Sequence, residues 1–154
     1  MPKTLGYMIT WTTYGSWLQG DKRGFVKNGR TYPGRKRLAD CNRQRLQKRP
    51  VKLSQRQRRT VEKAILEKAQ QLNQEICAVY VAGRHVHIVA KYIPVGIENI
   101  VRVYKSASVV ALRKVGLTGR IWTKGFDKRY CFDQRSLQER VRYVNSHNRR
   151  YACI

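Results

Sequence analysis

The sequence predicts an α+β protein with a four-stranded antiparallel sheet, two helices on one face of it, and a further helix at the C-terminal end. The first observation is the order of its periodic segments, which is strand, helix, strand, strand, helix, strand, helix. The second is that the first six elements have the split βαβ pattern of ferredoxin-like folds, an architecture that RNA-recognition domains share. The third is the length of 154 residues, which fits a single domain (1–154) with one modest core.

The first strand and the first helix are separated by a long basic segment. Residues 5–13 are rich in β-forming residues and predict the first strand. A basic insertion follows at about 14–53, with little expected regular structure and with charges that suit phosphate contacts. A solvated loop without a ligand is the alternative. Ser54 is a good N-cap, and apolar residues recur after it at helical spacing, which predicts a helix to about Leu72.

Two strands and a second helix are expected next. Residues 76–83 predict a buried strand and residues 85–93 another. The gap between them is too short for a helix, so they form a hairpin. Residues 97–116 have apolar side chains at helical spacing and end at a glycine, Gly116, which predicts a helix that stops there.

The last two elements are a strand and a helix. Residues 126–132 predict the fourth strand, and Asp133 or Ser136 is expected to cap the final helix. With two helices on one face of the sheet, the other face is left for a ligand and for this final helix.

The charge of the chain indicates a polyanionic partner. Lys and Arg number 33 against 9 Asp and Glu, for a formal net charge of +24. Such an excess on a small domain favours nucleic acid. A merely soluble basic surface is the alternative, and an anionic membrane is disfavoured because the basic residues are spread over the whole chain.

The cysteines and the hydropathy give weaker indications. Cys41, Cys77, Cys131 and Cys153 form no CxxC pair, which disfavours a thiolate zinc site and is typical of reduced thiols. The chain has neither a membrane-spanning apolar run nor the pattern of a signal peptide. We therefore expect a cytoplasmic protein, associated with the nucleoid if its partner is DNA.

Two of the three histidines form the sequence His-Val-His inside a predicted strand. Strand residues at i and i+2 point to the same face, so His85 and His87 can reach one metal ion while Val86 turns toward the helix-covered core. Imidazole is a common ligand of divalent ions. By itself the pair is weak evidence, and two surface histidines without a ligand are the alternative.

The third histidine lies four residues after a tyrosine on the final predicted helix. Residues at i and i+4 share a helix face, so His147 can be a third ligand with Tyr143 beside the same ion. The alternatives are an exposed helical histidine and a tyrosine that packs in the core.

Together these motifs resemble the HUH single-tyrosine transposases, which include small insertion-sequence transposases and the REP-associated tyrosine transposases. HVHIVAKY looks like the metal-binding strand of that family, KSAS at 105–108 like its Lys-x-x-Ser motif, and YVNSH at 143–147 like its catalytic helix. The segment IWTKGFDKRYCF resembles the part that leads to the tyrosine helix. His147 departs from the family, which usually has Gln or Asn there, and the 14–53 insertion is longer than in compact members.

The resemblance implies a metal-dependent transposase that cleaves and rejoins single-stranded DNA at hairpin-marked ends. Tyr143 would attack the phosphorus and form a 5′-phosphotyrosine, with His85, His87 and His147 holding Mg²⁺ or Mn²⁺, or Zn²⁺ in view of the third histidine. Energy stored in the covalent link removes any need for a nucleotide cofactor. A homodimer is implied, with the site built within one chain or shared between two.

The expected DNA contacts come from the Lys-x-x-Ser motif, from basic residues near the site and from the insertion. They are Lys105, Ser106, Ser108, Arg84, Trp17, Arg35, Lys36, Arg37 and Arg142. Trp11, Tyr14 and Trp17 are candidates for stacking on unpaired bases, with core packing equally open for Trp11.

Several alternatives remain open at this point. Tyr130 and Tyr151 compete as nucleophiles. Three other functions are open for the protein. It could be a domesticated HUH endonuclease that processes repeated palindromes, a non-catalytic ferredoxin-like nucleic-acid-binding module, or a zinc hydrolase with three histidine ligands.

Overall fold

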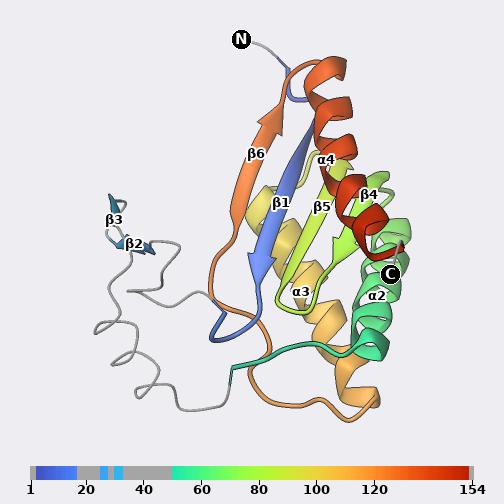
Figure 1. Ribbon diagram of the computed structural model, residues 1–154. Coiled ribbons are helices and arrows are strands. Elements are labelled where there is room, and N and C mark those ends of the chain that lie inside the picture. The colour runs from blue at the N-terminus through green and yellow to red at the C-terminus, as the bar shows by residue number, and fades with distance from the viewer. Residues whose placement is uncertain (1–2, 17–24, 28–29, 33–49, 153–154) are drawn as a thin grey trace.

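The predicted order of elements is found in the computed structural model, which describes residues 3–16, 25–27, 30–32 and 50–152. The main sheet contains β1 (Gly6–Thr12), β4 (Ile76–Val81), β5 (His85–Lys91) and β6 (Asp127–Cys131). Its strand order is β4-β5-β1-β6, and each neighbouring pair is antiparallel. Helices α2 (Gln55–Gln71) and α3 (Ile97–Lys114) cover one face, and α4 (Gln134–Ala152) crosses the other, as Figure 1 shows.

A second, small sheet lies within the predicted basic insertion. Strands β2 (Phe25–Lys27) and β3 (Arg30–Tyr32) pair as an antiparallel hairpin. The rest of the insertion from 17 to 49 lies outside the described residues, so its role stays a prediction.

The helix ends follow local sequence signals. The Ser54 hydroxyl accepts from the Gln57 amide at 3.2 Å, and the Gln57 side chain accepts from the Ser54 amide at 2.8 Å, which completes a capping box. At α4 the cap is Asp133, whose carboxylate accepts from the Ser136 amide at 2.7 Å. Gly116 follows the end of α3 with φ +92°, a conformation that glycine adopts without steric cost.

A buried polar network lies in the core beneath α2 and α3. The Gln74 amide nitrogen donates to the Tyr7 hydroxyl at 2.6 Å and to the Lys91 carbonyl at 2.9 Å. The Tyr104 hydroxyl donates to the Gln74 carbonyl oxygen at 2.5 Å, and burial raises the pKa of Tyr104. These bonds tie the turn after α2 to strands β1 and β5 and to helix α3.

The opposite core forms where α4 packs mainly on β4 and β5. Its buried side chains include Met8 and Val89 from the sheet and Leu137 and Val144 from α4. Gly6 in β1 permits this approach, because a Cβ there would lie 2.5 Å from the Ala90 carbonyl oxygen and 2.9 Å from the Leu137 side chain. Helix α4 is thereby fixed against the sheet beside strand β5, which carries the histidine pair.

The described helices share one further property. None of them is both long and apolar enough to cross a membrane.

Candidate active site on the sheet face beneath α4

Strand β5 displays the two histidines of the His-Val-His motif on the α4 side of the sheet. Val86 and Ile88 are fully buried on the other side, among the residues that pack against α2 and α3. The rings of His85 and His87 lie 4.7 Å apart between centroids. Strand alternation therefore places both imidazoles on one face, as the spacing predicts.

Helix α4 brings Tyr143 and His147 to the same place. The His147 ring centroid lies 5.3 Å from that of His87 and 6.4 Å from that of His85. The Tyr143 ring lies 4.8 Å from His147 and 5.8 Å from His87, and its side chain is 47% exposed. Buried Val144, one residue further along α4, fixes the rotation of the helix that produces this arrangement.

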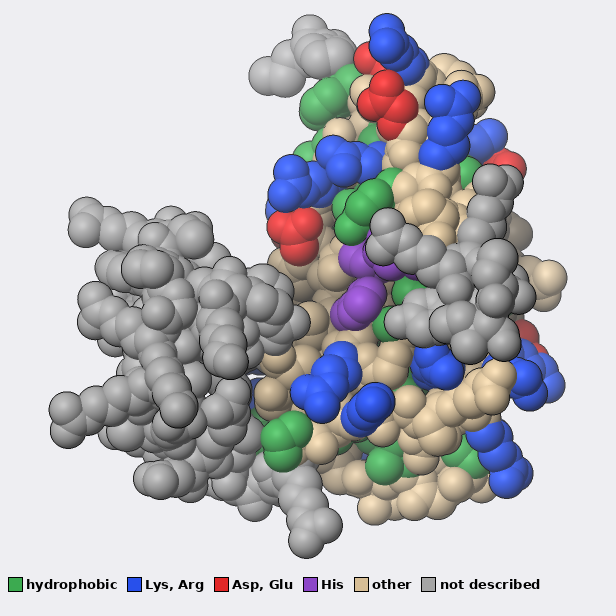
Figure 2. Space-filling model, in the orientation of Figure 1, with side chains coloured by type: hydrophobic (Ala, Val, Ile, Leu, Met, Phe, Trp, Pro, Cys, Tyr) green, Lys and Arg blue, Asp and Glu red, His purple; other side chains and the backbone are tan. Residues whose placement is uncertain are grey.

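The surroundings of the histidines are basic. Figure 2 shows histidine side chains at the surface of this face, with Lys and Arg side chains above and below them. Positive charge around the histidine rings attracts a phosphate.

Hydrogen bonds orient two of the rings. The Nδ1 atom of His147 lies 2.9 Å from the Tyr143 carbonyl oxygen. A carbonyl can only accept, so Nδ1 is a protonated nitrogen, and the neutral form of the ring would present the Nε2 lone pair of His147 to a ligand. The Nδ1 atom of His87 lies 2.8 Å from the Thr10 hydroxyl, a contact of the kind that orients metal-bound histidines.

Burial keeps His87 neutral. Its pKa is lowered from 6.5 to about 4, first because the buried ring is poorly solvated and then because His85 and His147 repel a further positive charge. A neutral imidazole at neutral pH is the form that binds metal ions.

The donor set fits a divalent ion by the chemistry of its three imidazoles. With nitrogen–metal distances of about 2.1 Å, two imidazoles on one ion have ring centroids about 5 Å apart. The observed separations span 4.7–6.4 Å. In the described part of the chain, no group of three or more His, Cys, Asp or Glu side chains is arranged to hold an ion, so binding requires the rings to turn.

Two residues at this site were not predicted. Tyr80 of β4 pairs with His87 across the strands, is buried, and has its ring 5.4 Å from His147 and 6.1 Å from His85. Thr10 of β1 is the partner of His87 on the other side. Both follow from the pairing register, and only the i, i+2 alternation of 76, 78 and 80 in β4 hints at Tyr80 in the sequence.

The Lys-x-x-Ser motif lies on α3, on the opposite side of the sheet from the histidines. The Lys105 ammonium donates to the carbonyls of Thr123 at 3.0 Å and Gly125 at 2.7 Å, and burial lowers its pKa. Ser108 is fully buried, donates to the Lys105 carbonyl and accepts from the Trp122 indole at 2.9 Å. These two side chains stabilise the segment after α3, and their DNA contacts stay predictions, as does that of exposed Ser106.

The other predicted contact residues fall into two groups. Arg84, in the β4–β5 turn, and Arg142, on α4, are exposed. Trp17, Arg35, Lys36 and Arg37 lie outside the described residues.

The remaining aromatic candidates are placed by burial. Trp11 is a core residue, 1% exposed, and Tyr14 is buried with the Arg120 guanidinium over its ring, so both occupy packing positions. Tyr130 lies edge-to-face with Tyr7, on the sheet side that faces α2 and α3. This position separates Tyr130 from the histidine cluster, and the side chain of Tyr151 lies outside the described ones.

Comparisons with known proteins agree with this architecture. A family model described as "Transposase IS200 like" matches residues 44–147. The solved structure of a REP-associated tyrosine transposase bound to a REP hairpin is similar, with TM-score 0.60 and 14% identity over 99% of this chain and 71% of that one. A candidate transposase from Deinococcus radiodurans R1 matches with TM-score 0.50 and 15% identity over 94% of this chain and 91% of that one. No curated protein matches the chain.

Proposed function

The chain belongs to the IS200-like transposase family, and from this premise we propose that it cleaves and rejoins single-stranded DNA with Tyr143 as the nucleophile. One observation carries the proposal: the Tyr143 ring lies within 4.8 Å of His147 and 5.8 Å of His87, between centroids, on an accessible face. A core tyrosine would instead be buried, whereas Tyr143 is 47% exposed.

The proposed metal site consists of His85, His87 and His147. A divalent ion bound there supplies Lewis-acid stabilisation of the charge that develops on the phosphate. The hydrogen bonds of His147 and His87 orient their rings, and the lowered pKa of His87 favours its neutral form, which has a lone pair available for a metal ion. Mg²⁺ and Mn²⁺ are the expected ions, and a third imidazole raises the relative affinity for Mn²⁺ and Zn²⁺.

In the proposed reaction Tyr143 replaces one oxygen of the scissile phosphate. The phenolic oxygen forms a bond to phosphorus, the bond between phosphorus and the 3′ oxygen breaks, and the 3′ oxygen takes up a proton as the phenol loses one. The product is a 5′-phosphotyrosine and a free 3′-OH. A second 3′-OH can reverse the step, so rejoining requires no nucleotide cofactor.

The proposed nucleophile, Tyr143, and the third histidine, His147, lie one turn apart on helix α4. The Nδ1 atom of His147 donates to the Tyr143 carbonyl, so both side chains move with α4 as one unit. In this structure they lie beside the histidine pair of the same chain. A homodimer that exchanged α4 would transfer both residues together, which keeps either arrangement compatible with the proposed chemistry.

The proposed substrate is single-stranded DNA that carries a hairpin. The net charge of +24 supports a nucleic-acid partner. A REP hairpin is bound by one of the structurally similar transposases, which supports the same kind of ligand for this chain.

The test is a cleavage assay on hairpin-bearing single strands from the DNA that flanks the gene, labelled at either end and incubated with Mn²⁺. The wild-type protein is expected to form a covalent adduct that resists denaturing electrophoresis. Tyr143→Phe and His85→Ala should abolish the adduct, and Tyr130→Phe, on the other side of the sheet, should preserve it. An adduct that persists in Tyr143→Phe would exclude this nucleophile, and cleavage without any adduct would favour a hydrolase.

A further inference from the structure

Thr10 lies directly opposite His87 in the sheet. Strand β1 runs antiparallel to β5, and the register pairs Thr10 with His87. Ile9 and Trp11, the neighbours of Thr10 in β1, are buried on the other side of the sheet, among the residues that pack against α2 and α3. Strand alternation therefore places the Thr10 side chain on the face that carries the histidines.

This pairing fixes the position of the Thr10 hydroxyl beside the His87 ring. Directly opposed residues in antiparallel strands have Cβ atoms about 4.5–5.5 Å apart, and a β-branched side chain has few χ1 rotamers. The Thr10 Oγ1 atom lies 2.8 Å from the Nδ1 atom of His87. On the other flank of His87, buried Tyr80 of β4 is paired with the same residue. The His87 ring, 8% exposed, is thus held between two strands with one nitrogen bound to Thr10.

The contact determines which nitrogen of His87 is left for an ion. With Nδ1 bound to Thr10, a ligand can meet only Nε2, and Nε2 has a lone pair only in the neutral tautomer whose proton is on Nδ1. A hydroxyl oxygen can accept as well as donate, so Thr10 can accept from that N–H. The Nδ1 atom of His147 donates in the same way to the Tyr143 carbonyl. That carbonyl belongs to the backbone, whereas the partner of His87 is a side chain that one substitution can remove.

We propose that Thr10 is a positioning residue of the metal site, which holds His87 in the tautomer that presents Nε2 to the ion. Thr10 acts through His87 and not by contact with the ion or the DNA. Without the hydroxyl, a metal-bound His87 would have a buried N–H that lacks an acceptor, which is costly. In the metal-free protein the proton can lie on Nε2 instead, so the cost falls on metal binding. The inference rests on the proposed function, because its ion is the one proposed for His85, His87 and His147.

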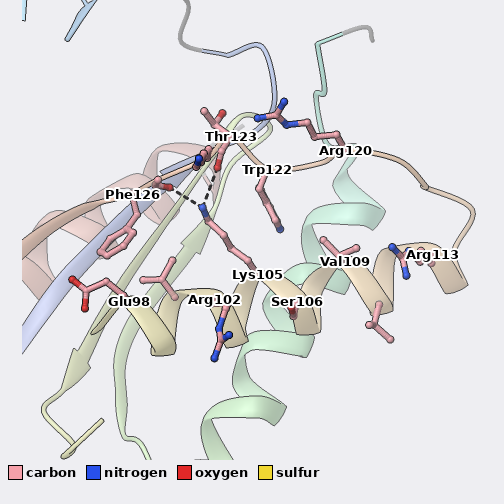
Figure 3. Close-up of a pocket in the computed structure, with 14 residues that line it drawn as sticks. Glu98, Arg102, Lys105, Ser106, Val109, Arg113, Arg120, Trp122, Thr123 and Phe126 are labelled. Carbon is pink, nitrogen blue, oxygen red and sulfur yellow. Dashed lines mark hydrogen bonds between the residues drawn. The ribbon is translucent and has the colours of Figure 1, made fainter. Parts of the chain in front are cut away.

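The test removes the Thr10 hydroxyl and compares it with a matched hydroxyl on the same strand. Thr10→Val keeps the shape and the β-branching of the side chain, and Thr10→Ser keeps the hydroxyl. Thr12→Val is the control, because Thr12 is likewise opposite a histidine, His85, but its hydroxyl donates to the Thr123 hydroxyl at 3.0 Å. Thr123 belongs to the segment that Lys105 holds through its carbonyls, as Figure 3 shows. The control therefore alters a hydrogen bond that holds a different part of the chain.

Affinity for Co²⁺ is measured without DNA, from the visible absorption of the bound ion. Co²⁺ is the probe because nitrogen sites bind it more tightly than Mn²⁺ and because its absorption changes with coordination. Thr10→Val is expected to bind Co²⁺ about 10- to 100-fold more weakly than Thr12→Val, which is the usual effect of removing a hydrogen bond to a metal ligand. Thr10→Ser should recover most of the affinity. Urea unfolding of the metal-free variants should give similar stabilities for Thr10→Val and Thr12→Val, since each loses one partly buried hydroxyl.

Three results would overturn the proposal. The first is equal Co²⁺ affinity for Thr10→Val and Thr12→Val. The second is a Thr10→Ser variant that binds as weakly as Thr10→Val, because the hydroxyl would then not be the cause. The third is a Co²⁺ spectrum of the wild-type protein that His87→Ala leaves unchanged, because His87 would then not be a ligand.

The kinetics of adduct formation give a second reading. At limiting Mn²⁺, Thr10→Val should lower kcat and leave the KM for DNA unchanged, and excess Mn²⁺ should restore the rate. A deficit that persists at saturating Mn²⁺ would contradict a role in metal binding. The two assays also separate this inference from the proposed function. A wild-type protein that forms no adduct, but whose Co²⁺ affinity depends on His87 and Thr10, refutes the chemistry of Tyr143 and retains the role of Thr10.

Discussion

Replacement of Gln74 by leucine is expected to lower the free energy of unfolding by about 2–4 kcal/mol. Gln74 is 5% exposed and bonds to the hydroxyls of Tyr7 and Tyr104 and to the Lys91 carbonyl. Leucine has a similar volume but cannot donate or accept. The substitution therefore leaves three buried or partly buried polar atoms without their partner.

The magnitude follows from the cost of unsatisfied polar groups. Loss of its acceptor costs the buried Tyr104 hydroxyl about 1–3 kcal/mol, and loss of their donor costs the Tyr7 hydroxyl and the Lys91 carbonyl about 1 kcal/mol each. The added apolar contact of leucine offsets about 1 kcal/mol. For a chain of this size the loss corresponds to a fall in Tm of about 5–15 °C.

The assay is urea unfolding followed by circular dichroism, with Gln71→Leu, at an exposed position near the end of α2, as the control. Tyr104→Phe removes the hydroxyl that Gln74→Leu leaves without an acceptor. In the Gln74→Leu background, Tyr104→Phe should therefore lower the free energy of unfolding by at least about 1 kcal/mol less than it does alone. If Gln74→Leu matched the control within about 0.5 kcal/mol, or if the two changes were additive, the account of this network would be refuted.

Three further predictions concern the helix cap, the strand–helix contact and the pH dependence. Ser54→Ala should cost about 1 kcal/mol in urea unfolding by removing the α2 cap, whereas Ser54→Asp should cost less. Gly6→Ala should lower Tm by several degrees more than Gly96→Ala, at an exposed glycine, because the added Cβ would lie 2.5 Å from the Ala90 carbonyl oxygen. Equal changes in Tm for the two variants would contradict the close packing at Gly6. The folded pKa of His87 lies near 4, below the unfolded value of 6.5, so the unfolded chain binds more protons between these values. Stability in EDTA should therefore fall as pH decreases from 6.5 to 4, and an undiminished fall in His87→Gln would assign the effect to other groups.

Much of the fold could be predicted because its signals are local. The cap at Ser54, the glycine after α3 and the alternation of His85, Val86 and His87 each depend on a few neighbouring residues. The rotation of α4 also follows from its own periodicity, since Val144 is buried and Tyr143 is not.

The rest depends on contacts between segments far apart in the chain. Tyr80 and Thr10 join the histidine cluster only through the pairing of β4 and β1 with β5. Gln74 meets its tyrosines only after the sheet and α3 are assembled. A motif in a single helix, such as Lys-x-x-Ser, does not by itself indicate which face of the sheet it will occupy, and here it lies away from Tyr143.

The chemistry of Tyr143 is tested most directly by locating the DNA on the protein. The adduct formed with Mn²⁺ and hairpin DNA is digested with nuclease and trypsin, and the peptides are sequenced by mass spectrometry. We predict a nucleotide linked through its 5′ phosphate to Tyr143. A nucleotide on Tyr130, on Tyr151 or on a serine, with unmodified Tyr143, would contradict the proposed active site.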